Sequence, residues 1–196
     1  MSNVVEKPSP PGTPPLRHET TAGNYFVANY PPFAFWKPEF VPEFHAALER
    51  SPNSELGTPN SELRTAFGQY VHIPFCRKRC HFCYFKVYTD KDSSEVRGYL
   101  DALLKELVVY ASKPAVAGRK PKFVYFGGGT PSYLSPDQLK FLTDGMKRLL
   151  PWDEVEEVTF EAEPGTLTDH KLHAIRDLGV TRLSLGIEHF DDHILE

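Results

Sequence analysis

All three cysteines of the 196-residue chain lie in one short segment, residues 70–86, with the sequence YVHIPFCRKRCHFCYFK. Cys76, Cys80 and Cys83 are four and then three residues apart, so a single loop can bring their thiolates to one metal centre. Thiolates are the usual ligands of iron–sulfur clusters, and a four-iron cluster held by three of them leaves one iron open. The segment therefore indicates an iron–sulfur site that can bind a substrate or cofactor.

A structural zinc site is the alternative, with the three cysteines and either His72 or His81 as ligands. Structural zinc is four-coordinate, and its ligands typically come as two pairs that are separated in the sequence. The chain has no second pair of this kind. The spacing of the cysteines therefore favours an iron–sulfur cluster over zinc.

The composition argues against nucleic acid or a membrane as a partner. The chain has 22 Lys and Arg against 26 Asp and Glu, a net charge of −4, so no overall basic field attracts polyanions. Its start lacks the pattern of a secretory signal or a transit peptide, and no apolar run could span a bilayer. Clustered cysteines in odd number are typical of metal binding in a reducing compartment. We therefore expect a cytoplasmic protein.

Strands and helices alternate from residue 70 onward. Apolar runs predict four strands, at residues 70–74, 122–126, 157–162 and 181–187. Periodic apolar residues predict three helices between them, at residues 96–111, 135–150 and 168–178. Ser135 and Gln138 form a capping-box pattern, and Gly179 is placed to end the third helix. Strands that alternate with helices at this spacing predict an α/β fold with parallel strands.

The predicted sheet is incomplete, because it would leave an exposed parallel edge, whereas parallel sheets are normally covered. We therefore expect residues 65–196 to be the N-terminal portion of a longer, barrel-like core domain. Residues 1–64 form a Pro-rich extension that we expect to be partly disordered, since 11 of the 18 prolines fall before residue 63. Aromatic residues between positions 25 and 44 predict that part of this extension packs against the core domain.

The carboxyl ends of the predicted strands carry the residues best placed to line a ligand site. Residues 127–130, GGGT, follow the second strand, and glycine lets the backbone approach a ligand closely. Glu161 and Glu163 lie on the same side of the third strand near its end. One face of the fourth strand carries Ser184, Gly186 and Glu188. Because ligands of parallel sheets bind at these ends, we expect a pocket that faces the cysteines.

Four ordered motifs carry a family resemblance: YVHIPFC, FGGGTPSYL, FEAEPGTL and RLSLGIEHFDD. They resemble the oxygen-independent coproporphyrinogen III oxidase group of the radical S-adenosylmethionine superfamily, which also contains heme chaperones and radical methyltransferases. The resemblance covers residues 70–192. It implies a partial (β/α)6 barrel with parallel strands, of which this chain is the N-terminal part, and a 4Fe-4S cluster on Cys76, Cys80 and Cys83. It also implies an oxidoreductase that cleaves S-adenosylmethionine reductively to methionine and a hydrogen-abstracting 5′-deoxyadenosyl radical.

The resemblance implies which residues bind S-adenosylmethionine: Tyr70, Phe82, Gly128, Gly129, Thr130, Glu161 and Glu188. The two glycines and Thr130 match positions that hold the methionine end of the cofactor. Glu161 matches a carboxylate near the charged groups of the cofactor. Glu188 stands where the family commonly has a glutamine in contact with the ribose, and a carboxylate can still accept hydrogen bonds from ribose hydroxyls. The motifs assign no catalytic residue that acts on the substrate.

Phe85 departs from the pattern of the oxidases, which usually have a further cysteine two residues past the third ligand. Three interpretations stay open: a divergent oxidase of porphyrin biosynthesis, a relative that binds and transfers heme, and a radical enzyme such as a methyltransferase on another substrate. The expected partners are S-adenosylmethionine, a porphyrinogen or heme, and a reducing electron-donor protein. The resemblance implies later strands and a C-terminal domain that supply most substrate contacts, and we expect them beyond residue 196.

Overall fold

The computed structural model of the chain describes residues 37–51, 67–83, 85–191 and 193. By its internal contacts the chain divides into two units, Met1–Pro42 and Glu43–Glu196. The described part of the first unit is a 3-10 turn, Pro38–Phe40, and the start of helix α1, Val41–Leu48. The predicted disordered start, most of the aromatic segment and the predicted domain boundary at residue 64 lie outside the described residues. The two-domain division stays a prediction.

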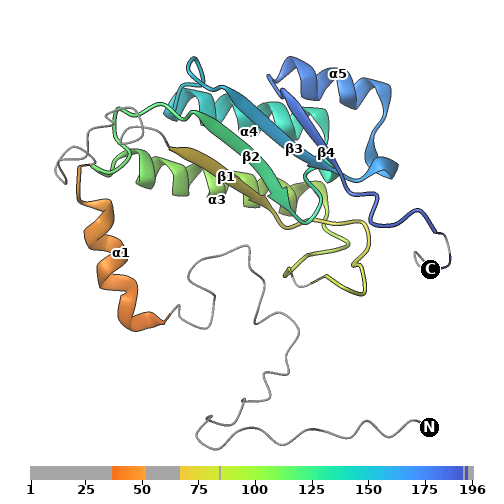
Figure 1. Ribbon diagram of the computed structural model, residues 1–196, viewed down its shortest axis with the longest axis horizontal. Helices are drawn as coiled ribbons and strands as arrows, with labels where there is room; N and C mark the ends of the chain where they lie inside the picture. The colour runs from red at the N-terminus through yellow and green to blue at the C-terminus, as the bar shows by residue number, and fades with distance from the viewer. Residues whose placement is uncertain (1–36, 52–66, 84, 192, 194–196) are drawn as a thin grey trace, which may run out of the picture. The chain divides into compact units, whose positions relative to one another are not determined.

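The second unit is built on one parallel sheet of four strands in the order β1-β2-β3-β4 (Figure 1). The strands are β1 (Gly68–Ile73), β2 (Phe123–Gly128), β3 (Glu157–Ala162) and β4 (Arg182–Leu185). The helices that connect them are α3 (Ser93–Ala111), α4 (Pro136–Leu149) and α5 (Asp169–Asp177). The predicted α/β class with parallel strands is therefore confirmed.

One face of the sheet is apolar, because alternate strand residues point toward the helices. Val71, Ile73, Phe126 and Phe160 are buried on this face. They form one core cluster with helix residues Val96, Leu100, Leu139, Leu142, Met146 and Ile175. The opposite face, which we call the polar face, carries Tyr70, His72, Tyr125, Gly127, Thr159, Glu161 and Ser184. The covered apolar face holds the strand ends in register, and the polar face is left for a ligand.

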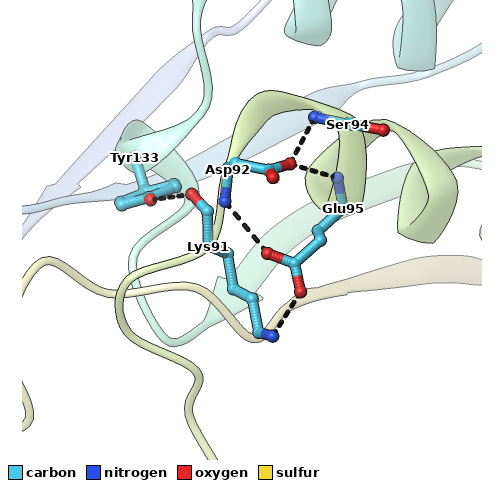
Figure 2. A network of polar contacts seen from close by, with 5 residues as sticks. All are labelled: Lys91, Asp92, Ser94, Glu95 and Tyr133. Carbon is cyan, nitrogen blue, oxygen red and sulfur yellow. Dashed lines mark hydrogen bonds and ion pairs between the residues drawn. The ribbon is translucent and has the colours of Figure 1, made fainter.

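Helix α3 begins three residues earlier than its apolar periodicity predicts, because Asp92 caps it. The Asp92 carboxylate accepts 2.8 Å hydrogen bonds from the N–H groups of Ser94 and Glu95, and Glu95 accepts one in return from the N–H of Asp92 (Figure 2). The hydroxyl of Tyr133 donates to the carbonyl of Lys91 at 3.1 Å. Tyr133 belongs to the turn after β2, so the start of α3 is tied to the end of that strand.

The sequence signals for the other helix ends are confirmed. Ser135 and Gln138 form the predicted capping box at the start of α4, and Thr168 caps α5. Gly179 follows α5 with a φ of 98°, a conformation that favours glycine. Within the described residues, none of the helices combines the length and the apolar character that crossing a membrane requires.

Candidate functional site

Strand β1 runs directly into residues 76–87, which we call the cysteine loop. A parallel bridge between Phe75 and Tyr88 closes the base of this loop. The N–H of Cys76 donates to the carbonyl of Tyr88 at 3.1 Å, and the N–H of Tyr88 donates to the carbonyl of Pro74 at 2.8 Å. Phe75 itself is buried in the core. The base of the cysteine loop is therefore fixed at the carboxyl end of the sheet.

Two arginines of the cysteine loop donate hydrogen bonds to backbone carbonyls. Arg79 donates to the carbonyl of Cys83 at 3.1 Å, within the loop itself. Arg77 donates at 3.2 Å to the carbonyl of Gly165, which lies in the 3-10 turn Pro164–Thr166 after β3. The cysteine loop is thus tied to the end of the third strand as well as to the first.

The three cysteines are free thiols that differ in exposure, since Cys76 is buried, Cys83 is partly exposed and Cys80 is exposed. Burial raises the pKa of the Cys76 thiol, a hydrogen bond from Thr130 opposes this rise, and the other two thiols add to it. The pKa of Cys80 is raised by burial and by the Cys83 thiol. No set of three His, Cys, Asp or Glu side chains in the described ranges already has a metal-binding arrangement. The cysteine loop therefore carries three free thiols that differ in exposure.

The backbone after β2 packs against the cysteine loop. The N–H of Gly129 donates to the carbonyl of Ile73, and the N–H of Thr130 donates to the carbonyl of Phe75, both at 2.8 Å. A Cβ added to Gly129 would lie 2.9 Å from Sγ of Cys76 and 2.9 Å from the Phe75 carbonyl oxygen, so only glycine fits. This arrangement fits an iron–sulfur cluster, because bare backbone can lie beside a cluster-binding sulfur.

Glu161 lies on the polar face near the end of β3. The hydroxyl of Tyr125, on β2, donates a 2.5 Å hydrogen bond to Oε1 of Glu161, and this bond is the main reason why the pKa of Tyr125 is raised to about 12. The rings of Tyr70 and Tyr125 stack with their centroids 5.9 Å apart. Burial and then the charge of Glu161 raise the pKa of Tyr70. Two predicted site residues, Glu161 and Tyr70, therefore belong to one group of side chains over Gly127.

Tyr125 is a residue of this group that the motifs did not identify. The sequence does hold a signal for it, because Tyr125 lies two residues before Gly127 and so shares its face of the strand. The parallel register pairs Tyr125 with Thr159 on the neighbouring strand. Glu161 lies two residues after Thr159, on the same face. Only the register, which the sequence does not specify, brings the two side chains together.

His72 also lies on the polar face. Its Nδ1 atom is 3.3 Å from the hydroxyl oxygen of Tyr70, and its ring centroid is 5.8 Å from that of Phe85. Burial lowers the pKa of His72 below its ordinary value, and the negative charge of Glu161 opposes this shift. A Cβ on Gly128, whose φ is 112°, would lie 2.7 Å from Nδ1. His72 is therefore packed between the glycine residues and Phe85.

Strand β4 ends at Leu185, two residues before the predicted end. The N–H of Gly186 still donates to the carbonyl of Ala162, at 3.1 Å, but Glu188 then adopts a φ of 65°, outside the strand region. The prediction that the strand extends to Glu188 is therefore wrong, because the strand ends at Leu185 and the backbone turns at Glu188.

Glu188 and Glu163 nevertheless lie near the cysteine loop. Burial is the main cause of the raised pKa of Cys80, and the negative charges of both glutamates raise it further. The charge of Glu163 also acts on Cys76. Phe82 is 62% exposed, and the described residues do not cover it. The structure thus brings the cysteines, the glycines, Thr130 and the acidic residues to one end of the sheet and leaves Phe82 at its margin.

Comparison with known proteins gives one family. The family profile described as the Radical SAM superfamily matches residues 70–196. The heme chaperone HemW of Bacillus subtilis is 41% identical over 128 residues, which cover 65% of this chain and 33% of the relative. The oxygen-independent coproporphyrinogen III oxidase of Synechocystis sp. is 32% identical over 168 residues, which cover 85% of this chain and 34% of the relative.

A solved structure is similar as well. It is described as "Coproporphyrinogen III oxidase (HemN) from Escherichia coli is a Radical SAM enzyme", with a TM-score of 0.70 and 30% sequence identity. The match covers 86% of this chain and 36% of the solved chain. The chain therefore spans about a third of the length of these relatives.

The surroundings of His72 give a prediction for its titration. Because burial lowers the pKa of His72, we expect its NMR titration midpoint to lie below about 6.5, the ordinary histidine value. Burial disfavours the charged imidazole in the folded protein, so its contribution to stability is present above about pH 6.5 and is lost as the pH falls through the folded pKa. Glu161→Gln removes the opposing charge and should lower the midpoint further. A midpoint that rises in this variant would contradict the assignment.

Proposed function

The chain belongs to the radical S-adenosylmethionine superfamily, and we propose that it binds a 4Fe-4S cluster and S-adenosylmethionine at the carboxyl end of its sheet. Cys76, Cys80 and Cys83 would hold the cluster, and the fourth iron would stay open to the amino and carboxylate groups of S-adenosylmethionine. The observation that carries this proposal is the contact between Gly129 and Cys76, where no side chain has room beside the sulfur. An oxygen-sensitive centre held by free thiols suits the reducing cytoplasm that we propose as its location.

The bound cluster and S-adenosylmethionine together supply one-electron reductive cleavage to methionine and a 5′-deoxyadenosyl radical. The residues of this chain bind and orient the cofactor. We assign the methionine end to Gly128, Gly129 and Thr130, whose backbone lies against the end of β1 and Phe75, next to the cysteine loop. The carboxylate of Glu161 would attract the positively charged groups of the cofactor.

Three further residues complete the proposed cofactor site. The ring of Tyr70 lies over Gly127 and is 58% exposed, and we assign it to packing against the cofactor. Glu188 is near enough to act on the Cys80 thiol and would accept hydrogen bonds from the ribose. Phe82 projects from the cysteine loop with most of its ring exposed, and we assign it to an apolar contact with the adenosine.

We infer that the whole protein is an oxidoreductase that resembles coproporphyrinogen III oxidase, with a porphyrinogen as the class of substrate and a reducing electron-donor protein as a partner. The oxidase from Synechocystis and the solved oxidase support this inference, because each matches more than four fifths of this chain. A heme-binding carrier is the second candidate, since HemW of Bacillus subtilis has the higher identity, 41%. Phe85, packed beside His72, stands where the oxidases usually have a cysteine, and this departure keeps the carrier as an alternative to the oxidase.

Full-length protein that is reconstituted with iron and sulfide under anaerobic conditions tests the enzymatic proposal. After reduction, it should cleave S-adenosylmethionine, and 5′-deoxyadenosine should accumulate above the level of a Cys80→Ala control. Adding coproporphyrinogen III should increase the yield if the protein is an oxidase. Stoichiometric binding and transfer of heme without turnover of the porphyrinogen would identify the carrier instead. Colourless protein that contains zinc but no sulfide would contradict both.

The contact at Gly129 gives a second prediction. Gly129→Ala places a methyl group against Sγ of Cys76 and the backbone, so the reconstituted variant should hold far less iron and sulfide than the wild type, which should hold about four of each. Gly98→Ala is the matched control, because nothing lies within 4 Å of its added Cβ on helix α3. A Gly129→Ala variant with a full cluster would show that the close approach is unimportant.

A further inference from the structure

Tyr125 makes a strong hydrogen bond at the proposed cofactor site, although none of the motif assignments includes it. Its hydroxyl lies 2.5 Å from Oε1 of Glu161, within the range of hydrogen bonds to a charged carboxylate. The ring cannot easily turn away, because it stacks on Tyr70 at 5.9 Å and packs beside Phe123 at 6.0 Å. With its pKa raised to about 12, the Tyr125 hydroxyl keeps its proton at neutral pH and remains the donor.

This bond gives the two oxygens of Glu161 different surroundings. Oε1 is bound by Tyr125, whereas Oε2 lies over Gly127, 3.0 Å from the position that a Cβ on Gly127 would take. The same Cβ would come within 2.8 Å of the Tyr125 ring and 3.1 Å of the Tyr70 ring. Two aromatic rings and one carboxylate oxygen thus close over Gly127, so that no side chain has room at this residue.

Glu161 has no cationic partner among the residues that the structure describes. No Lys or Arg in the ranges that the structure describes forms an ion pair with it, and Arg182, on the neighbouring strand, pairs with Glu157 at 3.5 Å instead. A half-buried carboxylate in this position attracts a cationic ligand group. Within the described residues, Glu161 is therefore oriented by Tyr125 and has no ion-pair partner.

We propose that Tyr125 is a positioning residue that holds Glu161 so that Oε2 receives the positively charged part of the ligand. This inference rests on the proposed function, because the ligand is S-adenosylmethionine. A glutamate side chain left free would spread over several rotamers, and ordering it during binding would weaken the affinity. Tyr125 orders the carboxylate before the ligand arrives, so it acts through Glu161 and not by contact with the reacting atoms.

The test is the dissociation constant of S-adenosylmethionine for the anaerobically reconstituted full-length protein, measured by titration calorimetry without reductant so that no turnover occurs. Tyr125→Phe keeps the ring and removes the hydroxyl, and it should weaken binding about tenfold. Glu161→Gln should weaken binding at least as much. In the Glu161→Gln background, Tyr125→Phe should have no further effect, because the hydroxyl acts through the carboxylate. Tyr110→Phe, on helix α3, is the control and should bind like the wild type.

Wild-type affinity in the Tyr125→Phe variant would overturn the proposal. Equal losses in both backgrounds would also overturn it, since they would mean that Tyr125 supports the fold and not the carboxylate. The proposed function fails separately, if wild-type protein that carries its cluster does not bind S-adenosylmethionine at all.

Discussion

The close approach of the Gly129 backbone to the sulfur of Cys76 is the constraint on which the site depends. It exists because the hydrogen bonds between β1 and β2 continue past the strand ends, from Gly129 to Ile73 and from Thr130 to Phe75. A side chain at Gly129 would separate these segments and move the cysteine loop. The apolar core behind the sheet keeps the two strand ends in register. The packing of the domain therefore helps to fix the position of Cys76, one of the three proposed cluster ligands.

Other contacts also fix the position of the cysteine loop. The bridge between Phe75 and Tyr88 closes its base, and Arg77 ties it to the turn after β3. The loop therefore contacts the ends of three parallel strands, where α/β proteins usually bind ligands. Strand β4 ends at Leu185, and the charge of Glu188 beyond it raises the pKa of Cys80 in the loop. Such a loop is anchored at its base, while its outer residues Cys80 and Phe82 stay exposed.

Local sequence signals predicted the fold well. Periodicity and capping patterns act over a few residues, so the strand Glu157–Ala162 and the helix starts at Ser135 and Thr168 could be recognised directly. The start of α3 was missed, because Asp92 caps the helix ahead of its first apolar residue. The end of β4 was missed, because alternation continues in the sequence where the backbone turns at Glu188.

The site could be predicted only in part, because its contacts depend on register. The cysteine spacing and the glycine run are visible in the sequence, and their motifs pointed to the correct superfamily. The bond between Tyr125 and Glu161 joins residues 36 positions apart, and only the pairing of β2 with β3 brings them together. The packing of Phe85 against His72 is likewise a tertiary contact that the spacing of residues cannot predict.

The proposed binding of S-adenosylmethionine to a 4Fe-4S cluster is tested most directly by electron paramagnetic resonance. The spectra of the reduced, reconstituted full-length protein would be compared with and without S-adenosylmethionine. We expect the signal of a four-iron cluster, and this signal should change when S-adenosylmethionine is added, because the ligand would bind the open iron. A cluster signal that stays the same at saturating S-adenosylmethionine, or protein that forms no cluster at all, would contradict the proposal.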